Sequence, residues 1–315
     1  MAVEAVFGGT TAWVSDIDPG ANAVLAHRWP TVPNLGDLTA VDWSAVEPVD
    51  VFCGGYPCQP FSSAGKRKGT ADERHIWPWI ARALGVLRPR VAVFENVAGH
   101  LRLGFDVVLR DLAELGFDAQ WCTVRASEVG APHQRNRLFL LATAADTPHL
   151  GHQRSGCARG RGHGPADHRD ASADPACLGH GNTRAPGLRG IQAAAVAGRP
   201  PAVPDPDGVG RGPDQPDVRA GQPDADWGRF APAIARWEHA TGRRAPWATD
   251  DRHRLSPVFV EWLMGVPASH VTAVPGLTRT QQLHALGNGV VPQQASAALR
   301  ILLDRYTTHD LPTAA

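Results

Sequence analysis

Short apolar runs alternate with stretches of helical periodicity along the first half of the chain. The runs are the candidate buried strands, at 13–14, 49–53, 91–94 and 138–141. Helical spacing falls between them, at 19–29, 71–87 and 105–116. Continuous apolar strands separated by helices are typical of a parallel sheet that is buried on both faces. The pattern therefore predicts an α/β fold with a doubly wound, mostly parallel sheet.

The pattern breaks down at residue 146. The stretch 146–226 has no Phe, Trp, Tyr, Lys or Glu and is rich in Gly and Pro. Such a composition buries too little apolar surface to offset the entropy lost on ordering. Helical periodicity returns at 231–243 and 257–264, and a last helix follows Pro292. We therefore predict a main domain from 1–145 and 280–315, a low-complexity flexible insertion at 146–226, and a small region at 227–279.

Charge and cysteine content narrow the class of protein. Lysine plus arginine balance aspartate plus glutamate at 31 each, so any affinity for nucleic acid must come from local patches. The five cysteines form no C-x-x-C pair, and histidines near Cys157 and Cys177 fit no zinc spacing, so we predict no metal. No apolar run approaches 18 residues, and the start lacks a signal peptide, which predicts a cytoplasmic protein with no membrane span.

Polar groups follow three of the predicted strands. Asp16, Cys58 and Glu95 each come after an apolar run, and ligands bind beyond the carboxyl ends of the strands in such sheets. Each residue also has an ordinary structural role open to it. Asp16 could cap a helix, a lone cysteine is usually a small buried hydrophobe, and Glu95 could cap a turn. Their convergence on one edge of the sheet favours a functional site.

Two further segments can complete that site. Arg135 and Arg137 lead into a strand, where arginines bind planar or anionic groups, although a solvated pair is the alternative. The run 286–292 places a Gly-x-Gly turn before a helix that begins near Pro292. A helix N-terminus behind such a turn favours a carboxylate or a phosphate, and the alternative is a simple tight turn.

Four motifs in this order resemble those of the DNA cytosine-5 methyltransferases. They are Gly55-Tyr56-Pro57-Cys58-Gln59-Pro60-Phe61-Ser62, Phe94-Glu95-Asn96-Val97, His133-Gln134-Arg135-Asn136-Arg137 and Gly287-Asn288-Gly289-Val290. The resemblance covers about 1–145 and 250–305. It implies the Rossmann-like sheet of class I methyltransferases, with a small, partly disordered target-recognition region between the arginine motif and Ser256.

The resemblance also implies roles for the residues that match. Cys58 would add to C6 of a cytosine flipped out of duplex DNA, because the base must leave the stack to be reached. Glu95 would hold or protonate N3 of the base. Arg137 matches the arginine that holds O2, and Arg135 matches its supporting neighbour.

S-adenosylmethionine is the cofactor that the resemblance implies. The matching cofactor residues are Asp16, Ile17, Asp37, Leu38, Pro57, Asn288 and Gly289. Segment 62–76 resembles a mobile loop that closes over DNA, and its matching residues are Ser62, Lys66, Arg67, Lys68 and Arg74. Cations in this loop would meet phosphates and give affinity without sequence information. The implied partners are double-stranded DNA and, for a restriction-linked member, a cognate endonuclease; we expect a monomer.

One departure from the family keeps alternatives open. The family begins with a strand and a Gly-rich turn that cradles the cofactor, whereas Met1 starts inside what reads as the following helix, with Phe7-Gly8-Gly9 as its C-cap. We therefore expect a chain truncated before that motif. One alternative is a catalytically impaired DNA-binding remnant without the glycine loop. Another is a thiol hydrolase that uses Cys58 with His75 or His133.

Overall fold

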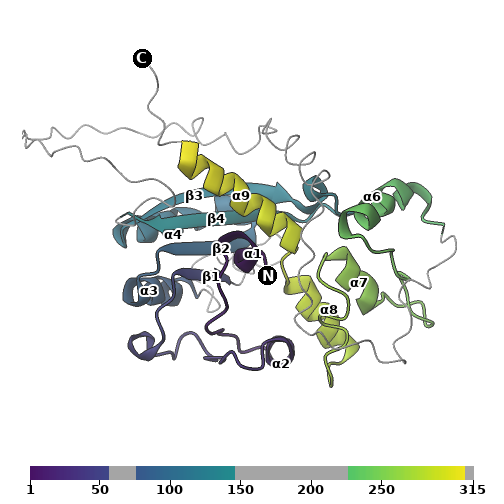
Figure 1. The fold of residues 1–315 in the computed structure, drawn as a ribbon, viewed down its shortest axis with the longest axis horizontal. Coiled ribbons are helices and arrows are strands. Elements are labelled where there is room, and N and C mark those ends of the chain that lie inside the picture. The colour runs from purple at the N-terminus through teal and green to yellow at the C-terminus, as the bar shows by residue number, and fades with distance from the viewer. Residues whose placement is uncertain (57–75, 146–225, 309–315) are drawn as a thin grey trace, which may run out of the picture.

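A four-stranded sheet forms the centre of the protein (Figure 1). The computed structural model describes residues 1–56, 76–145 and 226–308. The strands lie in the order β1-β2-β4-β3. Their bounds are Val51–Gly55 for β1, Val91–Val97 for β2, Phe117–Arg125 for β3 and Asn136–Ala144 for β4.

The described sheet is mixed. β1 and β2 run parallel, with Gly55 opposite Glu95, whereas β4 runs antiparallel to both β2 and β3. The predicted α/β, Rossmann-like fold is confirmed, but the expectation of mostly parallel strands holds for the β1–β2 pair alone among the described strands. The connections explain the difference. A parallel pair needs a long crossover, which includes α3, whereas the short link 126–135 suits antiparallel neighbours.

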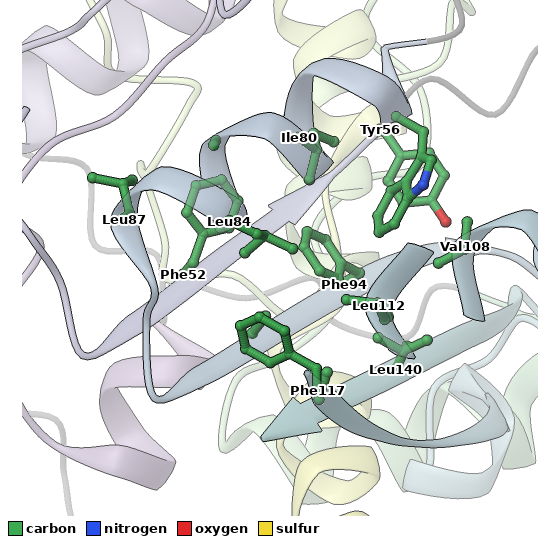
Figure 2. Close-up of a cluster of buried hydrophobic side chains, with 14 of the residues drawn as sticks. Phe52, Tyr56, Ile80, Leu84, Leu87, Phe94, Val108, Leu112, Phe117 and Leu140 are labelled. Atoms are coloured by element: carbon green, nitrogen blue, oxygen red, sulfur yellow. The ribbon is translucent and has the colours of Figure 1, made fainter. Parts of the chain in front are cut away.

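Helices cover both faces of the sheet. On one face lie α3 (Trp77–Leu87) and α4 (Phe105–Glu114), and on the other lie α1 (Ala2–Phe7) and α9 (Pro292–Thr308). Alternate residues of β2 enter opposite layers: Phe94 packs with the α3 and α4 side chains, and Val93 packs with those of α9. Figure 2 shows the first of these layers. The continuous apolar run at 91–94 thus reflects burial on both sides.

The remaining helices form a group beside the sheet (Figure 1). They are α2 (Pro19–Arg28), α6 (Ala231–Thr241), α7 (Pro257–Leu263) and α8 (Arg279–Asn288). Short 3-10 turns lie at Trp43–Ala45, Ala98–Arg102, Ala126–Val129 and Gly228–Phe230. Trp237 and Trp262 fill a separate core between α6 and α7, and the Trp237 indole donates to the Trp262 carbonyl at 2.9 Å.

Several predicted helix ends are confirmed. The Asp18 side chain caps α2 by accepting from Ala21 N at 2.8 Å, and α1 ends at Gly8, whose φ of 75° suits glycine. Other expectations fail. Val14 makes only an isolated bridge with Asn34 in place of a strand, while β3 and α8 were not predicted. The insertion at 146–225 and residues 71–75 of the predicted helix at 71–87 lie outside the described residues.

Within the described part of the chain, none of the helices has the length and apolarity needed to cross a bilayer.

The α9 face offers a direct test of the two-layer packing. Leu299 is 1% exposed and packs against β2 and β4 side chains. We expect Leu299→Ala to lower the free energy of unfolding by about 2–5 kcal/mol, because the cavity and the lost transfer free energy add. Arg300→Ala, at an exposed position of the same helix, should change it by less than about 0.5 kcal/mol. Urea unfolding measures both, and equal effects would contradict the packing.

His133 joins the segment before β4 to α7, and its burial gives a pH test. Its Nε2 donates to the Leu263 carbonyl at 3.0 Å. Burial lowers the pKa of His133; the nearby Arg135 and Arg137 add to this, and the Leu263 bond opposes it. The folded protein thus binds this proton less readily than the unfolded chain. The resulting stability is present above the ordinary histidine pKa and is lost as pH falls through and below it.

His133→Gln keeps a donor for the carbonyl but cannot take up a proton. We therefore expect its free energy of unfolding to fall less between pH 7.5 and pH 5 than that of the unaltered protein. His239→Gln, at an exposed position of α6, serves as the control. Urea titrations at the two pH values provide the measurement, and an unchanged pH dependence in His133→Gln would be evidence against burial of this ring.

Candidate functional site

The parallel pair β1–β2 brings two sequence motifs together at one edge of the sheet. Gly55 lies opposite Glu95, and a Cβ atom at Gly55 would come within 3.4 Å of Glu95 Oε2. The end of β1 thus lies next to the Glu95 carboxylate. Tyr56 follows and is the last described residue before Pro57 and Cys58. Residues predicted in this loop lie outside the described residues: Pro57, Cys58, Ser62, Lys66, Arg67, Lys68, Arg74 and His75.

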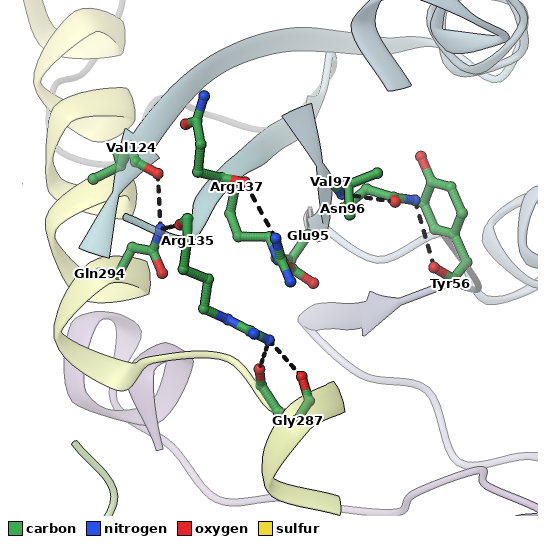
Figure 3. Close-up of polar contacts among 11 residues, drawn as sticks. Tyr56, Glu95, Asn96, Val97, Val124, Arg135, Arg137, Gly287 and Gln294 are labelled. Atoms are coloured by element: carbon green, nitrogen blue, oxygen red, sulfur yellow. Dashed lines mark hydrogen bonds and ion pairs between the residues drawn. The ribbon is translucent and has the colours of Figure 1, made fainter. Parts of the chain in front are cut away.

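Glu95 and Arg137 form an ion pair across β2 and β4. Arg137 Nε lies 2.7 Å from Glu95 Oε1, and the two side chains are 19% and 17% exposed (Figure 3). The antiparallel register places Arg137 opposite Val97, two residues along the strand from Glu95. Burial raises the pKa of Glu95, and the charges of Arg137 and Arg135 oppose this rise. The carboxyl group is thus suited to hold a proton while an arginine fixes its position.

A buried polar network ties the end of β1 to the turn after β2. The Tyr56 hydroxyl lies 2.7 Å from His100 Nε2, and His100 Nδ1 lies 3.0 Å from the Leu103 carbonyl. A carbonyl can only accept, so Nδ1 donates and Nε2 accepts from the hydroxyl of Tyr56. Burial also raises the pKa of Tyr56 and keeps that hydroxyl protonated. Asn96 adds a longer contact to the Tyr56 carbonyl, at 3.5 Å.

Sequence reasoning did not assign a role to His100 or to Asn96. Asn96 is 3% exposed, and its Oδ1 accepts from the Val97 amide at 2.8 Å, so it shapes the strand end behind Glu95. His100 is fully buried. A histidine in an otherwise apolar stretch is the sole sequence signal for it, and that signal does not specify a tyrosine partner 44 positions earlier.

Arg135 is directed to a different place from Arg137. Its Nη2 donates to the carbonyls of Gly287, at 2.8 Å, and Gly289, at 2.6 Å (Figure 3). These carbonyls flank Asn288, the last residue of α8. The predicted arginine pair is therefore divided between two tasks in the structure: Arg137 holds Glu95, and Arg135 holds the turn between α8 and α9.

The residues predicted to bind a cofactor gather on two neighbouring segments. The Val14–Asn34 bridge and a 2.7 Å bond from Ser15 Oγ to the Gly36 carbonyl bring 14–17 beside 34–38. This first segment carries Asp16, Ile17, Asp37 and Leu38. The second segment carries Asn288 and Gly289 at the end of α8.

His284 links the two segments. Its Nε2 lies 3.2 Å from Asn288 Nδ2, and its Nδ1 lies 3.9 Å from the Asp18 carboxylate at the start of α2.

The chemistry of these groups fits an adenosyl group. Hydrogen bonds from Thr39 lower the pKa of Asp37, which keeps it an ionised acceptor. Asp16 is a second carboxylate, and such groups accept from ribose hydroxyls and from amino groups. Ile17 is 70% exposed, which leaves an apolar surface open to a base. Asn288 is also exposed. Among the described residues, no group of three His, Cys, Asp or Glu side chains could hold a metal ion.

Comparison with known proteins finds a family model whose range includes the first three of the four motifs. A family model described as C-5 cytosine-specific DNA methylase matches residues 2–159. Type II methyltransferase M.NgoBV of Neisseria gonorrhoeae is 32% identical over 167 residues, which cover 49% of this chain and 38% of that protein. A protein of Escherichia phage P1 called DNA N-6-adenine-methyltransferase is 43% identical over 108 residues, or 30% of this chain and 14% of that protein.

The fold also has a solved counterpart. The structure of S. pombe Dnmt2 methyltransferase superposes with a TM-score of 0.55 at 16% identity, covering 96% of this chain and 94% of that one. At this identity the likeness concerns the fold. The family model, in contrast, spans half of the sequence and includes the strand ends that carry Glu95 and Arg137. The chain therefore belongs to the C-5 cytosine-specific DNA methylase family.

Proposed function

We propose that this protein is a DNA (cytosine-5-)-methyltransferase that modifies cytosine in duplex DNA through a covalent adduct with Cys58. The observation that carries the proposal is the Glu95–Arg137 pair, 2.7 Å apart, at the strand edge where the Cys58 loop begins. A carboxyl group with a raised pKa beside a fixed guanidinium suits a neutral base that must be protonated.

The first step follows from these groups. The Cys58 thiolate adds to C6 of the flipped-out base, and the electrons of the C5–C6 double bond move to form a double bond between C4 and C5. The electrons of the former N3–C4 double bond move to N3, which takes a proton from Glu95. C5 thereby becomes an electron-rich enamine carbon. Arg137 binds O2 of the base while its Nε holds the carboxyl group of Glu95. One guanidinium thus contacts both the proton donor, Glu95, and the substrate base.

S-adenosylmethionine supplies the methyl group to C5 when it is bound. The C5 proton is then lost to solvent water as the C5–C6 double bond re-forms and the C6–S bond breaks to release Cys58 as a thiolate, and N3 returns its proton to Glu95. Asp16 and Asp37 would hold the ribose and adenine of the cofactor and Ile17 would cover the adenine ring, with Leu38 and Pro57 alongside. Asn288 and Gly289 would hold its methionine end.

Duplex DNA is the proposed substrate, bound in part by the loop that follows Cys58. Ser62, Lys66, Arg67, Lys68 and Arg74 would contact phosphates. The names of the Type II relatives also support a cognate restriction endonuclease as a partner. Calorimetry with S-adenosylmethionine separates this proposal from a DNA-binding remnant, because micromolar binding is inconsistent with a lost cofactor site.

Trapping with 5-fluorocytosine DNA tests the proposed chemistry. We expect the unaltered chain to form a covalent complex and to produce 5-methylcytosine in ordinary duplex DNA. Cys58→Ser should lose both while it still binds S-adenosylmethionine. Cys53→Ser is a matched control, because Cys53 is a free cysteine in the adjacent strand β1 and should retain both activities.

Other outcomes of this experiment identify the alternatives. Methyl transfer by Cys58→Ser at the unaltered rate would remove Cys58 from the mechanism. N6-methyladenine as the product would favour the chemistry named for the phage P1 relative. A thiol hydrolase would form no adduct with the fluorinated base.

The charge of Arg137 makes a second prediction about Glu95. Because Arg137 lowers the pKa of Glu95 against the effect of burial, we expect Arg137→Gln to raise that pKa further. Carbon-13 titration of the side-chain carboxyl groups measures the shift, and the spectrum of Glu95→Gln identifies the resonance. Arg110→Gln, at an exposed position of α4, should leave the resonance unchanged. A lower pKa in Arg137→Gln would contradict the observed ion pair.

A further inference from the structure

The link between β4 and the C-terminal helix is a closed ring of contacts. The Arg135 side chain donates to the carbonyls of Gly287 and Gly289. α9 begins three residues after Gly289, at Pro292. From its first turn, Gln294 Nε2 donates back to the Arg135 carbonyl at 2.8 Å. The side chain of Arg135 thus holds the turn before α9, while α9 holds the backbone of Arg135.

Gln294 also fixes the neighbouring strand. It is fully buried, and the second hydrogen of its amide goes to the Val124 carbonyl near the end of β3, at 2.7 Å. One amide group therefore joins β3 and the segment entering β4 at the point where the two strands diverge. Both hydrogens of the buried amide thus have acceptors, whereas its Oε1 has no hydrogen-bond partner among the described residues.

The backbone conformation of Arg135 requires the support of these hydrogen bonds. Its φ is 31°, a left-handed conformation that L side chains rarely adopt. A residue keeps such a conformation only where surrounding contacts determine it, and this is common at functional sites. The bonds from Arg135 to Gly287 and Gly289, and from Gln294 to Arg135, are those contacts.

The ring joins the two halves of the candidate site. The strand that follows Arg135 carries Arg137, which holds Glu95. The turn that Arg135 holds carries Asn288 and Gly289, the proposed contacts for the methionine end of the cofactor. Two arginines two positions apart therefore serve the base side and the cofactor side of one reaction centre.

We propose that Arg135 is a positioning residue that holds the 287–289 turn in its cofactor-binding geometry and, with Gln294, couples that turn to the strand carrying Arg137. The inference rests on the proposed function, since it assigns Arg135 to the cofactor turn and not to the base. Gln294, which lies outside the four sequence motifs, shares this positioning role through its two bonds to backbone carbonyls.

Hydrogen exchange and calorimetry on the full chain test this inference. The Gly289 amide bonds to the Ala285 carbonyl at 3.0 Å, so a loosened turn should exchange faster. We expect Arg135→Met to speed amide exchange in a peptide spanning 285–292 and to weaken S-adenosylmethionine binding about tenfold, within the usual range of coupling between sites. Arg135→Lys should give an exchange rate and an affinity between those of the unaltered chain and those of Arg135→Met, because one ammonium lacks the planar fork of donors.

Matched variants keep the outcome clear. Gln294→Leu should also speed exchange at 285–292, while Arg125→Met, at an exposed position at the end of β3, should change neither quantity. Exchange in a β2 peptide checks that each variant is folded. Unchanged exchange in Arg135→Met would overturn the inference, and so would faster exchange with an unchanged dissociation constant. Failure of the unaltered chain to bind S-adenosylmethionine would count against the proposed function, and the exchange data would still decide whether Arg135 holds the turn.

Discussion

The partly buried ion pair between Glu95 and Arg137 is the interaction on which the described site depends. Two charges with less than a fifth of their side chains exposed have lost most of their hydration, and each stabilises the other in place of water. Removing one partner destabilises the protein, because the other charge is left uncompensated. The pair therefore forms only where a rigid frame already brings the two groups together.

The sheet provides that frame. Glu95 lies near the end of a strand that is covered on both faces, and Arg137 comes from the adjacent antiparallel strand, so the separation of the two side chains is set by the strand register. The frame is secured at both sides of the pair. On one side the Tyr56–His100 hydrogen bond anchors the end of β1, and on the other Arg135 and Gln294 join β4 to the start of α9. Arg135 also adds a charge near Glu95 that, like the charge of Arg137, lowers the pKa of the Glu95 carboxyl group.

Much of this architecture could be predicted from the sequence, for a clear physical reason. The run 91–94 is apolar at every position because each face of β2 is covered, and that burial is visible in the residues themselves. Capping residues such as Asp18 and Gly8 also mark helix ends locally. In contrast, β3 contains Asp118, Gln120 and Thr123 and has no clean alternation, so its strand character depends on its pairing with β4.

The candidate site also has parts that could be predicted from the sequence and parts that could not. Glu95 and Arg137 were assigned from their motifs, and the structure brings them together. The hydrogen bonds from Arg135 to two glycine carbonyls could not be predicted. Every residue has a backbone carbonyl, and the sequence does not indicate which carbonyl accepts from a given arginine. The polar helix α8 was missed because its apolar positions are few and its start depends on a reciprocal bond between Thr278 and Gln281.

The amide of Gln294 also restricts which residues can occupy its position. Its nitrogen faces two carbonyl oxygens, at 2.7 Å and 2.8 Å, in a place with no exposed surface. Glutamate has nearly the same shape, yet an ionised carboxylate there would place an oxygen against both acceptors and replace two attractions by two repulsions. Spontaneous deamidation would make the same exchange of one atom. The size of the side chain is thus a poor guide to tolerance at this position, where the direction of hydrogen-bond donation decides whether β3, β4 and α9 stay joined.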